Sequence, residues 1–169
     1  MASPTRIREL LAPTEIYVKP LLKVFSNNLI KGAAHITGGG FFENIPRSLP
    51  DTNLASKINQ TNWTIPEIFQ WLQFEGGISD REMFSTFNCG VGMILIARPE
   101  NVDECLRVLR DRGDSPTVIG SLRPLPQKGC EQVEVISPSG QNMQVQATIA
   151  DVSTSEAYAA AGVDIEAGT

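Results

Sequence analysis

Residues 35–47 read His35-Ile-Thr-Gly-Gly-Gly-Phe-Phe-Glu-Asn-Ile-Pro-Arg47. Three consecutive glycines stand here between a short apolar segment and residues that can begin a helix. Glycine packs no side chain and costs backbone entropy, so a triplet indicates positive φ angles or a close approach of the backbone to another group. A strand, a glycine turn and a helix start also present unpaired backbone N–H groups, which suit an anionic oxygen. A tight crossing from strand to helix without any ligand is the alternative.

Sequence patterns on both sides of this run predict interleaved helices and strands. Residues 92–97 form a continuous apolar run, as in a strand covered on both faces, whereas residues 132–136 alternate. We predict helices over residues 6–11 and 19–26, and strands over residues 31–36, 54–58, 92–97, 117–122 and 132–136.

Three further helix starts carry one signature, a capping residue followed three positions later by glutamate. They are Thr64-Ile-Pro-Glu67, Ser79-Asp-Arg-Glu82 and Asn101-Val-Asp-Glu104. Apolar residues at 65, 68, 69 and 72, and again at 102, 105, 106 and 109, predict one buried face on the first and on the last of these helices.

The order of these elements predicts a single sheet with helices packed on it, an α/β or α+β sandwich over residues 1–136. From Ser137 onward small and polar residues predominate, so residues 137–155 are interpreted as a linker.

Composition restricts the function. The 169 residues, 41% of them hydrophobic, suffice for one domain with a core. A net charge of −5 without a basic cluster argues against nucleic acid as a partner, and no apolar run approaches the roughly 18 to 20 residues that cross a bilayer. The N-terminus lacks a signal-peptide profile, which indicates a cytoplasmic protein. Three cysteines without CxxC spacing and a single histidine argue against a metal site.

Four strings in this chain carry a resemblance to a known family. They are Leu11-Ala-Pro-Thr-Glu-Ile-Tyr-Val-Lys-Pro20, Ala34-His-Ile-Thr-Gly-Gly-Gly-Phe-Phe-Glu-Asn-Ile-Pro-Arg47, Thr86-Phe-Asn-Cys-Gly-Val-Gly-Met93 and Val118-Ile-Gly120. In their order and spacing they resemble the C-terminal half of aminoimidazole ribonucleotide synthetase, also called phosphoribosylformylglycinamidine cyclo-ligase. Glu15 departs from the family pattern, which usually has arginine there.

The resemblance implies a three-layer α/β/α sandwich, partly ferredoxin-like. It also implies the substrate-side half of an ATP-dependent ligase of de novo purine biosynthesis, which closes the imidazole ring of formylglycinamidine ribonucleotide to give aminoimidazole ribonucleotide. ATP and Mg²⁺ would be bound mainly by a nucleotide-binding half that this sequence lacks, and the isolated chain would be inactive. That half would be the main partner, and a homodimer would form through it. Selenophosphate and hydrogenase-maturation proteins share the architecture, but the glycine string favours the purine enzyme.

Residues 157–168 resemble the opening of the same enzyme. We therefore interpret residues 156–169 as the start of a following synthetase unit, poorly ordered here, and the chain as a fragment of a multifunctional purine-synthesis polypeptide. The alternative function is a non-catalytic interdomain module from a duplicated synthetase copy.

The candidate site residues follow from the glycine run and the resemblance. Backbone N–H groups of Gly38, Gly39 and Gly40 could receive a phosphate or the substrate carbonyl. His35, whose imidazole suits proton transfer, could act directly or orient substrate, although a strand histidine is more often a core residue. The remaining candidates could each contact substrate, with a capping or surface role as the alternative: Thr37, Glu43, Asn44 and Arg47.

A second candidate turn precedes the apolar run at 92–97. Asn88 and Gly90 could approach a ligand there, or serve packing alone. Cys89 is interpreted as a small buried residue and not as a nucleophile. Lys19, in the Tyr-Val-Lys-Pro string, could contact substrate or lie on the surface.

Overall fold

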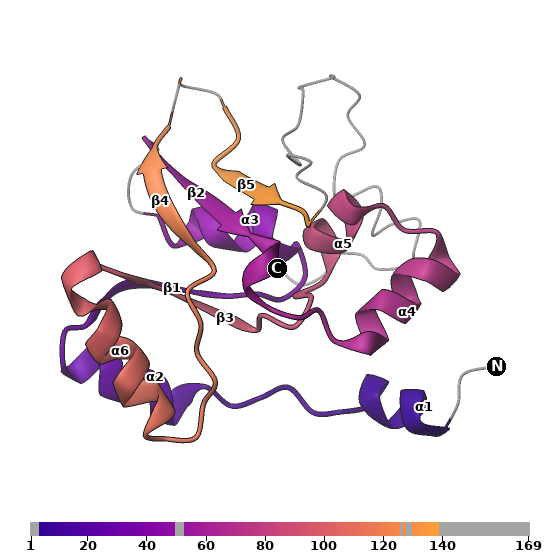
Figure 1. Cartoon of the computed structure of the whole chain (residues 1–169), viewed down its shortest axis with the longest axis horizontal. Coiled ribbons are helices and arrows are strands. Elements are labelled where there is room, and N and C mark those ends of the chain that lie inside the picture. Colours follow the sequence, from indigo (N-terminus) through magenta and orange to yellow (C-terminus); the bar gives the residue numbers. More distant parts are fainter. Residues whose placement is uncertain (1–3, 50–52, 126, 128–129, 139–169) are drawn as a thin grey trace, which may run out of the picture.

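Two antiparallel strands lead into the glycine run. The computed structural model describes residues 4–49, 53–125, 127 and 130–138. Within them β1 (Ile30–His35) pairs with β3 (Met93–Ala97), with His35 opposite Met93. β1 ends at His35, directly before the glycine run, so this pair places the run at one end of a two-stranded sheet (Figure 1).

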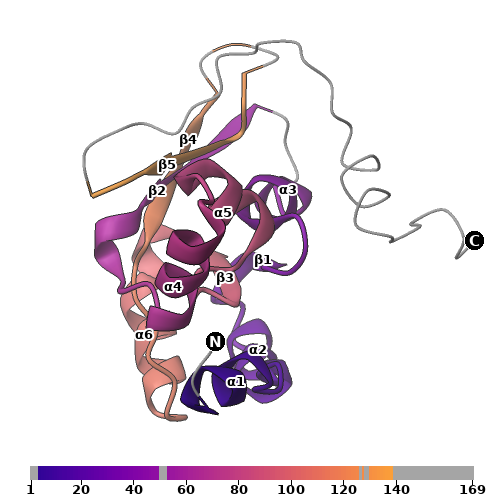
Figure 2. The ribbon, with the colours of Figure 1, turned by 90° about the vertical axis from the view of Figure 1, so that its right-hand side faces the viewer.

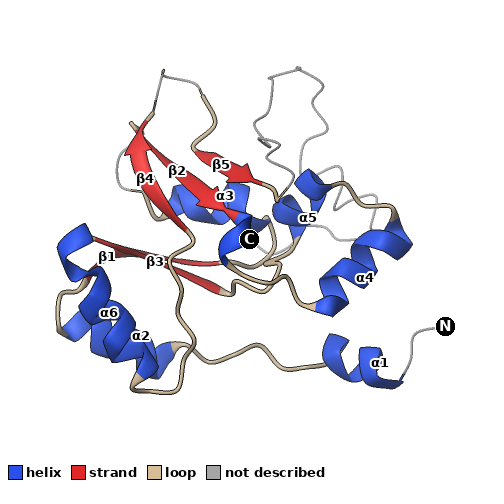
Figure 3. Ribbon diagram, in the orientation of Figure 1, coloured by secondary structure: helices blue, strands red, loops and turns tan. Residues whose placement is uncertain are grey.

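A second sheet has three strands. Its centre is β2 (Leu54–Asn59), which pairs antiparallel with β4 (Gly120–Pro124) and parallel with β5 (Val133–Ile136). The two sheets are separate in the described residues (Figure 3), so the prediction of a single sheet is wrong. Among the described strands, β3 pairs only with β1, and β4 and β5 both pair with β2, so no strand links the two sheets. The strand predicted at residues 117–122 begins later than predicted. The Val118 carbonyl accepts from the Asn62 side chain and the Ile119 carbonyl from the Asn59 N–H, and regular pairing with β2 starts at Gly120.

Six α-helices and two short 3₁₀ turns complete the described residues. The helices predicted at 6–11 and 19–26 are present with small shifts of their ends. The helices are α1 (Pro4–Leu10), α2 (Val18–Ser26), α3 (Gly40–Arg47), α4 (Glu67–Gly76), α5 (Asp80–Thr86) and α6 (Val102–Arg110), with 3₁₀ turns at Gln60–Asn62 and Pro99–Asn101.

The three predicted capping boxes have three outcomes. At α5 the box forms, because the Ser79 side chain accepts from the Glu82 N–H and Glu82 reaches back to the Ser79 N–H. At α4 it is wrong: the helix begins at Glu67 with Pro66 as its N-cap, because the residue before a proline is driven away from helical angles. At α6 the start is right, but the Asn101 side chain makes no cap.

Two hydrophobic cores meet along β1. The first joins α3, α5 and both sheets, with Phe41 and Val135 fully buried. The second is smaller and joins α2 and α6 to the start of β1, with Val24 fully buried. Figure 2 shows α6 and α2 at one end of the molecule and the β2 sheet at the other.

Helices and strands mix without a repeating unit, which confirms the predicted α+β class. β3 is less covered than predicted, because only Ile94 of its residues is buried. Ser137 follows β5 and is buried, and Pro138 after it is exposed. Residues 139–155 of the predicted linker and the predicted unit at 156–169 lie outside the described residues. In the part of the chain that the structure describes, no helix is long and apolar enough to cross a membrane.

Candidate functional site

The glycine run forms a sharp loop between β1 and α3. Gly39 (φ 89°) and Gly40 (φ 53°) both adopt positive φ angles. The Gly40 N–H donates to the Thr37 carbonyl at 3.0 Å, which closes the turn. A Cβ on Gly40 would overlap the Phe84 carbonyl oxygen of α5, so packing against α5 requires a glycine at this position.

Asn44 holds this loop from inside. Its side chain is only 5% exposed. Its Oδ1 accepts from the Thr37 N–H at 2.7 Å, and its Nδ2 donates to the Gly38 carbonyl at 3.2 Å. Asn44 was predicted as a substrate contact or a cap, and the structure instead places it beneath the loop with its polar atoms in use.

The loop leaves backbone donors unused. Among the described residues, no hydrogen bond is recorded from the N–H of Gly38 or of Gly39. Thr37 and Gly38 lie on the surface, whereas Gly39 is buried. Because these donors precede the first turn of α3, they combine with the positive end of the helix dipole and suit an anionic oxygen.

Glu43 and Arg47 form an ion pair beside the loop. The Arg47 guanidinium lies 3.3 Å from the Glu43 carboxylate, and the Arg47 side chain is 71% exposed. The Glu43 carboxylate lies where a Cβ on Gly39 would be. Arg47 is the last residue of the eight-residue α3, about 10 Å along the helix from Gly40. The structure therefore brings Glu43 to the loop and Arg47 only to Glu43.

His35 stands at the exposed end of β1. Its ring contacts the ring of Tyr17 edge to face, with centroids 5.8 Å apart. The side chain is exposed, so the alternative of a buried core histidine is wrong. Tyr17 was not singled out from the sequence, although it lies in one of the strings that carried the resemblance.

The second predicted turn serves packing. The Asn88 Oδ1 accepts from the Gly90 N–H at 3.0 Å, and a Cβ on Gly90 (φ 94°) would lie 2.5 Å from the Pro66 ring. Cys89 is fully buried between them, and burial raises the pKa of its thiol to about 12, which confirms a small buried residue. Lys19 is exposed on α2, and no side-chain contact to the glycine loop is recorded for it.

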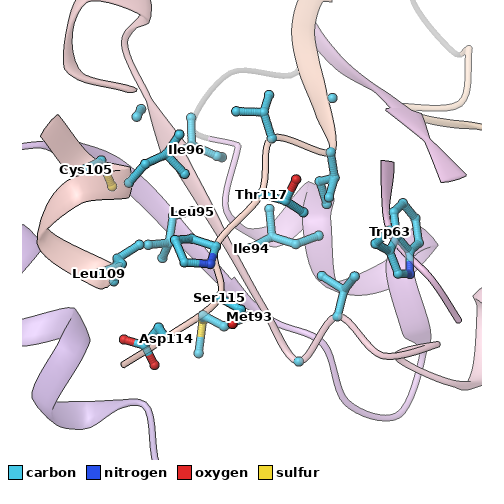
Figure 4. A pocket seen from close by; sticks show the side chains of 18 of the residues that line it. Trp63, Met93, Ile94, Leu95, Ile96, Cys105, Leu109, Asp114, Ser115 and Thr117 are labelled. Atoms are coloured by element: carbon cyan, nitrogen blue, oxygen red, sulfur yellow. The ribbon is translucent and has the colours of Figure 1, made fainter. Parts of the chain in front are cut away.

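A cavity of about 650 Å³ has Tyr17 in its lining. Figure 4 shows part of the lining, including Trp63, Asp114 and Thr117. The outer edge of β3 forms one wall, and α6 with residues 113–122 forms the other. The lining is mainly apolar, and its polar groups include Glu15, Tyr17, Asp114 and Ser115. Of the predicted site residues, only Gly90 lines it.

The charge at the Tyr17 end of this cavity is negative, because the carboxylates of Glu15 and Asp114 lie near the Tyr17 hydroxyl. Burial, with smaller contributions from the carboxylates of Glu15 and Asp114, raises the pKa of the Tyr17 hydroxyl. A Cβ on Gly92 would overlap that hydroxyl, which fixes Tyr17 against β3. Sequence reasoning missed this cavity, because its walls come from segments that are far apart in the chain.

The described residues do not fit a metal ion. No group of three or more histidine, cysteine, aspartate or glutamate side chains within them is arranged to hold one. The described residues bring together a loop with two unpaired backbone donors, an exposed histidine and a half-buried tyrosine.

Comparisons with known proteins identify the family. Residues 2–127 match the model described as AIR synthase related protein, C-terminal domain. The chain is 50% identical over 113 residues to the phosphoribosylformylglycinamidine cyclo-ligase of Chromobacterium violaceum, covering 67% of this chain and 32% of that protein. It is 49% identical over 114 residues to the bifunctional purine biosynthetic protein PUR2,5 of Pichia angusta, covering 68% of this chain and 14% of that protein.

Among solved structures, the E. coli hydrogenase maturation protein HypE is similar with a TM-score of 0.56 and 13% identity, over 87% of this chain and 45% of that one. This likeness concerns the fold alone. The chain spans about a third of the length of the cyclo-ligase that it matches. It belongs to the family of AIR synthase related proteins and corresponds to their C-terminal domain.

Proposed function

We propose that this chain is the substrate-side half of a phosphoribosylformylglycinamidine cyclo-ligase. In that reaction ATP activates the amide oxygen of formylglycinamidine ribonucleotide, and an amidine nitrogen then closes the imidazole ring. The observation that carries the proposal is the 50% identity over 113 residues with a protein of that name. The glycine loop supplies a physical reason for it.

The loop offers donors for an anionic oxygen of the substrate. The N–H groups of Gly38 and Gly39 have no partner among the described residues, and Asn44 fixes the backbone that carries them. Donors that are fixed in advance stabilise developing negative charge without reorganisation. Arg47 partly neutralises Glu43, which would otherwise repel an anion at the same place.

His35 is the residue for proton transfer in this proposal. It is exposed beside the loop, and its ring is oriented by Tyr17. An imidazole at that position can take a proton from the attacking amidine nitrogen or contact the phosphate of the ribonucleotide.

Other requirements fall to a second domain. ATP and its Mg²⁺ would be bound mainly by a nucleotide-binding half, and a homodimer would form through that half. The described residues of this chain do not fit a metal ion. The proposed setting is the cytoplasm, and the three free cysteines support a reducing compartment.

The test is ATP-dependent turnover of formylglycinamidine ribonucleotide by the full chain, alone and mixed with a separately expressed nucleotide-binding domain of a relative. We expect activity only on mixing. Gly39→Ala should then lower kcat at least about tenfold, because it disturbs the donors of the loop. Gly77→Ala is the matched control, since Gly77 also has a positive φ (58°) but no atom lies within 4 Å of an added Cβ. A folded chain that stays inactive in the mixture would instead indicate the non-catalytic interdomain module.

A further inference from the structure

The cavity that Tyr17 lines lies apart from the glycine loop. None of residues 35–40 belongs to its lining. Its volume of about 650 Å³ falls within the range of roughly 300 to 1,000 Å³ that is typical of small-molecule sites. The cavity therefore has the size of a ligand site, and the substrate proposed for the glycine loop does not account for it.

The walls of this cavity are mainly apolar. β3 contributes Ile94 and Ile96 on one side, and α6 contributes Leu106 on the other. Figure 4 shows Trp63 and Asp114 at opposite ends of the side chains drawn, with Ile94 between them. Apolar walls of this length gain free energy when an apolar ligand replaces water along them. The walls therefore favour a ligand with an apolar body.

The charged side chains of the lining are both acidic. They are Glu15 and Asp114, and no lysine, arginine or histidine belongs to the lining among the described residues. Burial, and to a smaller extent these two carboxylates, raises the pKa of the Tyr17 hydroxyl, so the two acidic side chains lie at the same end of the cavity. Such an end repels anions, and a phosphate of a ribonucleotide or of ATP does not suit it.

One carboxylate oxygen of Asp114 lacks a hydrogen-bond donor. Its Oδ2 is shielded from solvent, and no hydrogen bond to it is recorded within the described residues. The Asp114 N–H donates to the Leu109 carbonyl at 3.3 Å, which holds the residue close behind the end of α6. A carboxylate oxygen kept from water without a donor costs free energy. A ligand ammonium group reached by a small rotation of the soft χ2 torsion would supply that donor and neutralise the charge.

Two other occupants do not fit the acidic end. Residues 139–169 of this chain contain four acidic and no basic side chains, so they would add negative charge there: Asp151, Glu156, Asp164 and Glu166. A hard metal ion requires more oxygen ligands than two carboxylates provide, and the part of the chain that the structure describes holds no group of three metal-binding side chains.

We propose that this cavity binds a small molecule in which a protonated amine is joined to an apolar body, at a site separate from the glycine loop. The ammonium group pairs with Asp114, near Glu15 and the Tyr17 hydroxyl, and the apolar body lies along β3 toward Trp63. This proposal does not depend on the proposed function, because binding of the amine requires no turnover.

The experiment titrates the full chain, with nitrogen-labelled tryptophan, with phenethylamine at neutral pH. Trp63 lines the cavity and Trp71 does not, so the two indole N–H resonances report on the site and on a control position in one sample. We expect a saturable shift of the Trp63 resonance with a Kd below about 1 mM, while the Trp71 resonance stays in place. Absence of a saturable Trp63 shift in the folded chain would overturn the proposal.

Two further probes of similar shape test the charge of the ligand. Phenethyl alcohol is neutral and should bind at least about tenfold more weakly than phenethylamine, because it lacks the charge-assisted hydrogen bond. Phenylpropionate is an anion and should leave the Trp63 resonance in place. Equal affinities for the amine and the alcohol, or saturable binding of phenylpropionate, would each contradict the assignment of a cationic ligand.

Asp114→Asn tests the acidic end, because it keeps the shape of the side chain and removes the charge. It should weaken phenethylamine binding at least about tenfold and leave the affinity for phenethyl alcohol within about twofold. Asp103→Asn is the matched control, since Asp103 is exposed on α6 and does not line the cavity, and it should change neither affinity more than about twofold. Thermal melts establish that both variants are folded. Unchanged amine binding by Asp114→Asn would refute the pairing.

Thr117→Trp tests the cavity itself. Thr117 is part of the lining, and a bulky ring at this position should occupy the space of the apolar body. The affinities for phenethylamine and phenethyl alcohol should then both fall at least about tenfold. If the folded Thr117→Trp variant binds phenethylamine as the wild type does, the amine binds elsewhere and the proposal fails.

Discussion

The glycine loop differs in what holds it from a set of exposed apolar side chains near the N-terminus. We call this set the N-terminal strip: Ile7, Leu10, Leu11, Ile16, Val18, Leu22 and Phe25. The loop is fixed by the domain itself, through the buried Asn44 and the close approach of Gly40 to α5. The strip exposes apolar side chains, such as Leu11 at 77% and Ile16 at 80%, that nothing among the described residues covers. The comparison shows that one surface feature of this domain is fixed from inside, while the other is left uncovered by the described residues.

The largest expected effect is on the loop. Gly40→Ala should lower the free energy of unfolding by about 3 to 5 kcal/mol, because the new Cβ meets the Phe84 backbone at a positive φ. Urea denaturation of the full chain measures it. Gly77→Ala, with a positive φ and open space, should lower it by only about 1 to 2 kcal/mol. Equal effects of the two substitutions would mean that the loop is not packed against α5.

The next largest effect is expected from removing the Asn44 side chain beneath the loop. Asn44→Ala should lower the free energy of unfolding by about 2 to 3 kcal/mol, since it leaves the Thr37 N–H and the Gly38 carbonyl without their partner. Asn62→Ala is the control. Asn62 also donates to a backbone carbonyl, that of Val118, but it is exposed, so the change should stay within about 1 kcal/mol. If Asn44→Ala lowered the free energy of unfolding no more than Asn62→Ala does, Asn44 would not be what holds the loop in place.

The two sides of α2 compare core and strip within one helix. Val24→Ala should lower the free energy of unfolding by about 2 kcal/mol, because Val24 is fully buried. Leu22→Ala should change it by less than about 0.5 kcal/mol in the isolated chain, because Leu22 is 63% exposed. A large loss at Leu22 would show that the strip is packed within this chain and needs no partner.

The reactivity of the cysteine thiols compares how readily the two hydrophobic cores open, and here we expect the smallest effect. Cys89 lies in the core beneath the loop, Cys105 in the core beneath the strip, and Cys130 is exposed. We expect an aromatic disulfide reagent to modify Cys130 first, Cys105 more slowly and Cys89 last. Burial raises the pKa of both buried thiols, that of Cys89 to about 12, and a raised pKa leaves less thiolate at any given pH.

Mass spectrometry of single-cysteine variants gives the order of modification, and the rate at each buried thiol should rise with pH. Faster modification of Cys89 than of Cys105 would show that the core beneath the loop opens more readily than the core beneath the strip.

Local sequence rules predicted the parts of the fold that depend on few neighbours. The glycine run, the capping box at Ser79 and the apolar strand at 92–97 are short-range signals, and the structure places a loop, a helix start and β3 there. The helix start predicted at Thr64 is wrong because Pro66 keeps the residue before it out of helical angles. The capping rule does not take this restriction into account.

Long-range features could not be predicted in the same way. The division into two sheets depends on where residues 113–122 pass, and the cavity depends on segments that meet only after folding. At the site, the sequence indicated the donors of the loop but left open whether Arg47 contacts substrate or lies on the surface, because it does not show how far along α3 a side chain lies. It also did not indicate Tyr17 as the contact of His35.

The most direct test of the loop as a substrate site is an amide spectrum of the glycine-labelled chain, mixed with the unlabelled nucleotide-binding domain and titrated with formylglycinamidine ribonucleotide. We predict saturable shifts of the Gly38 and Gly39 resonances, while those of the positive-φ control Gly77 stay in place. Stationary Gly38 and Gly39 resonances in a sample that turns over substrate would contradict the assignment of the glycine loop as the binding site.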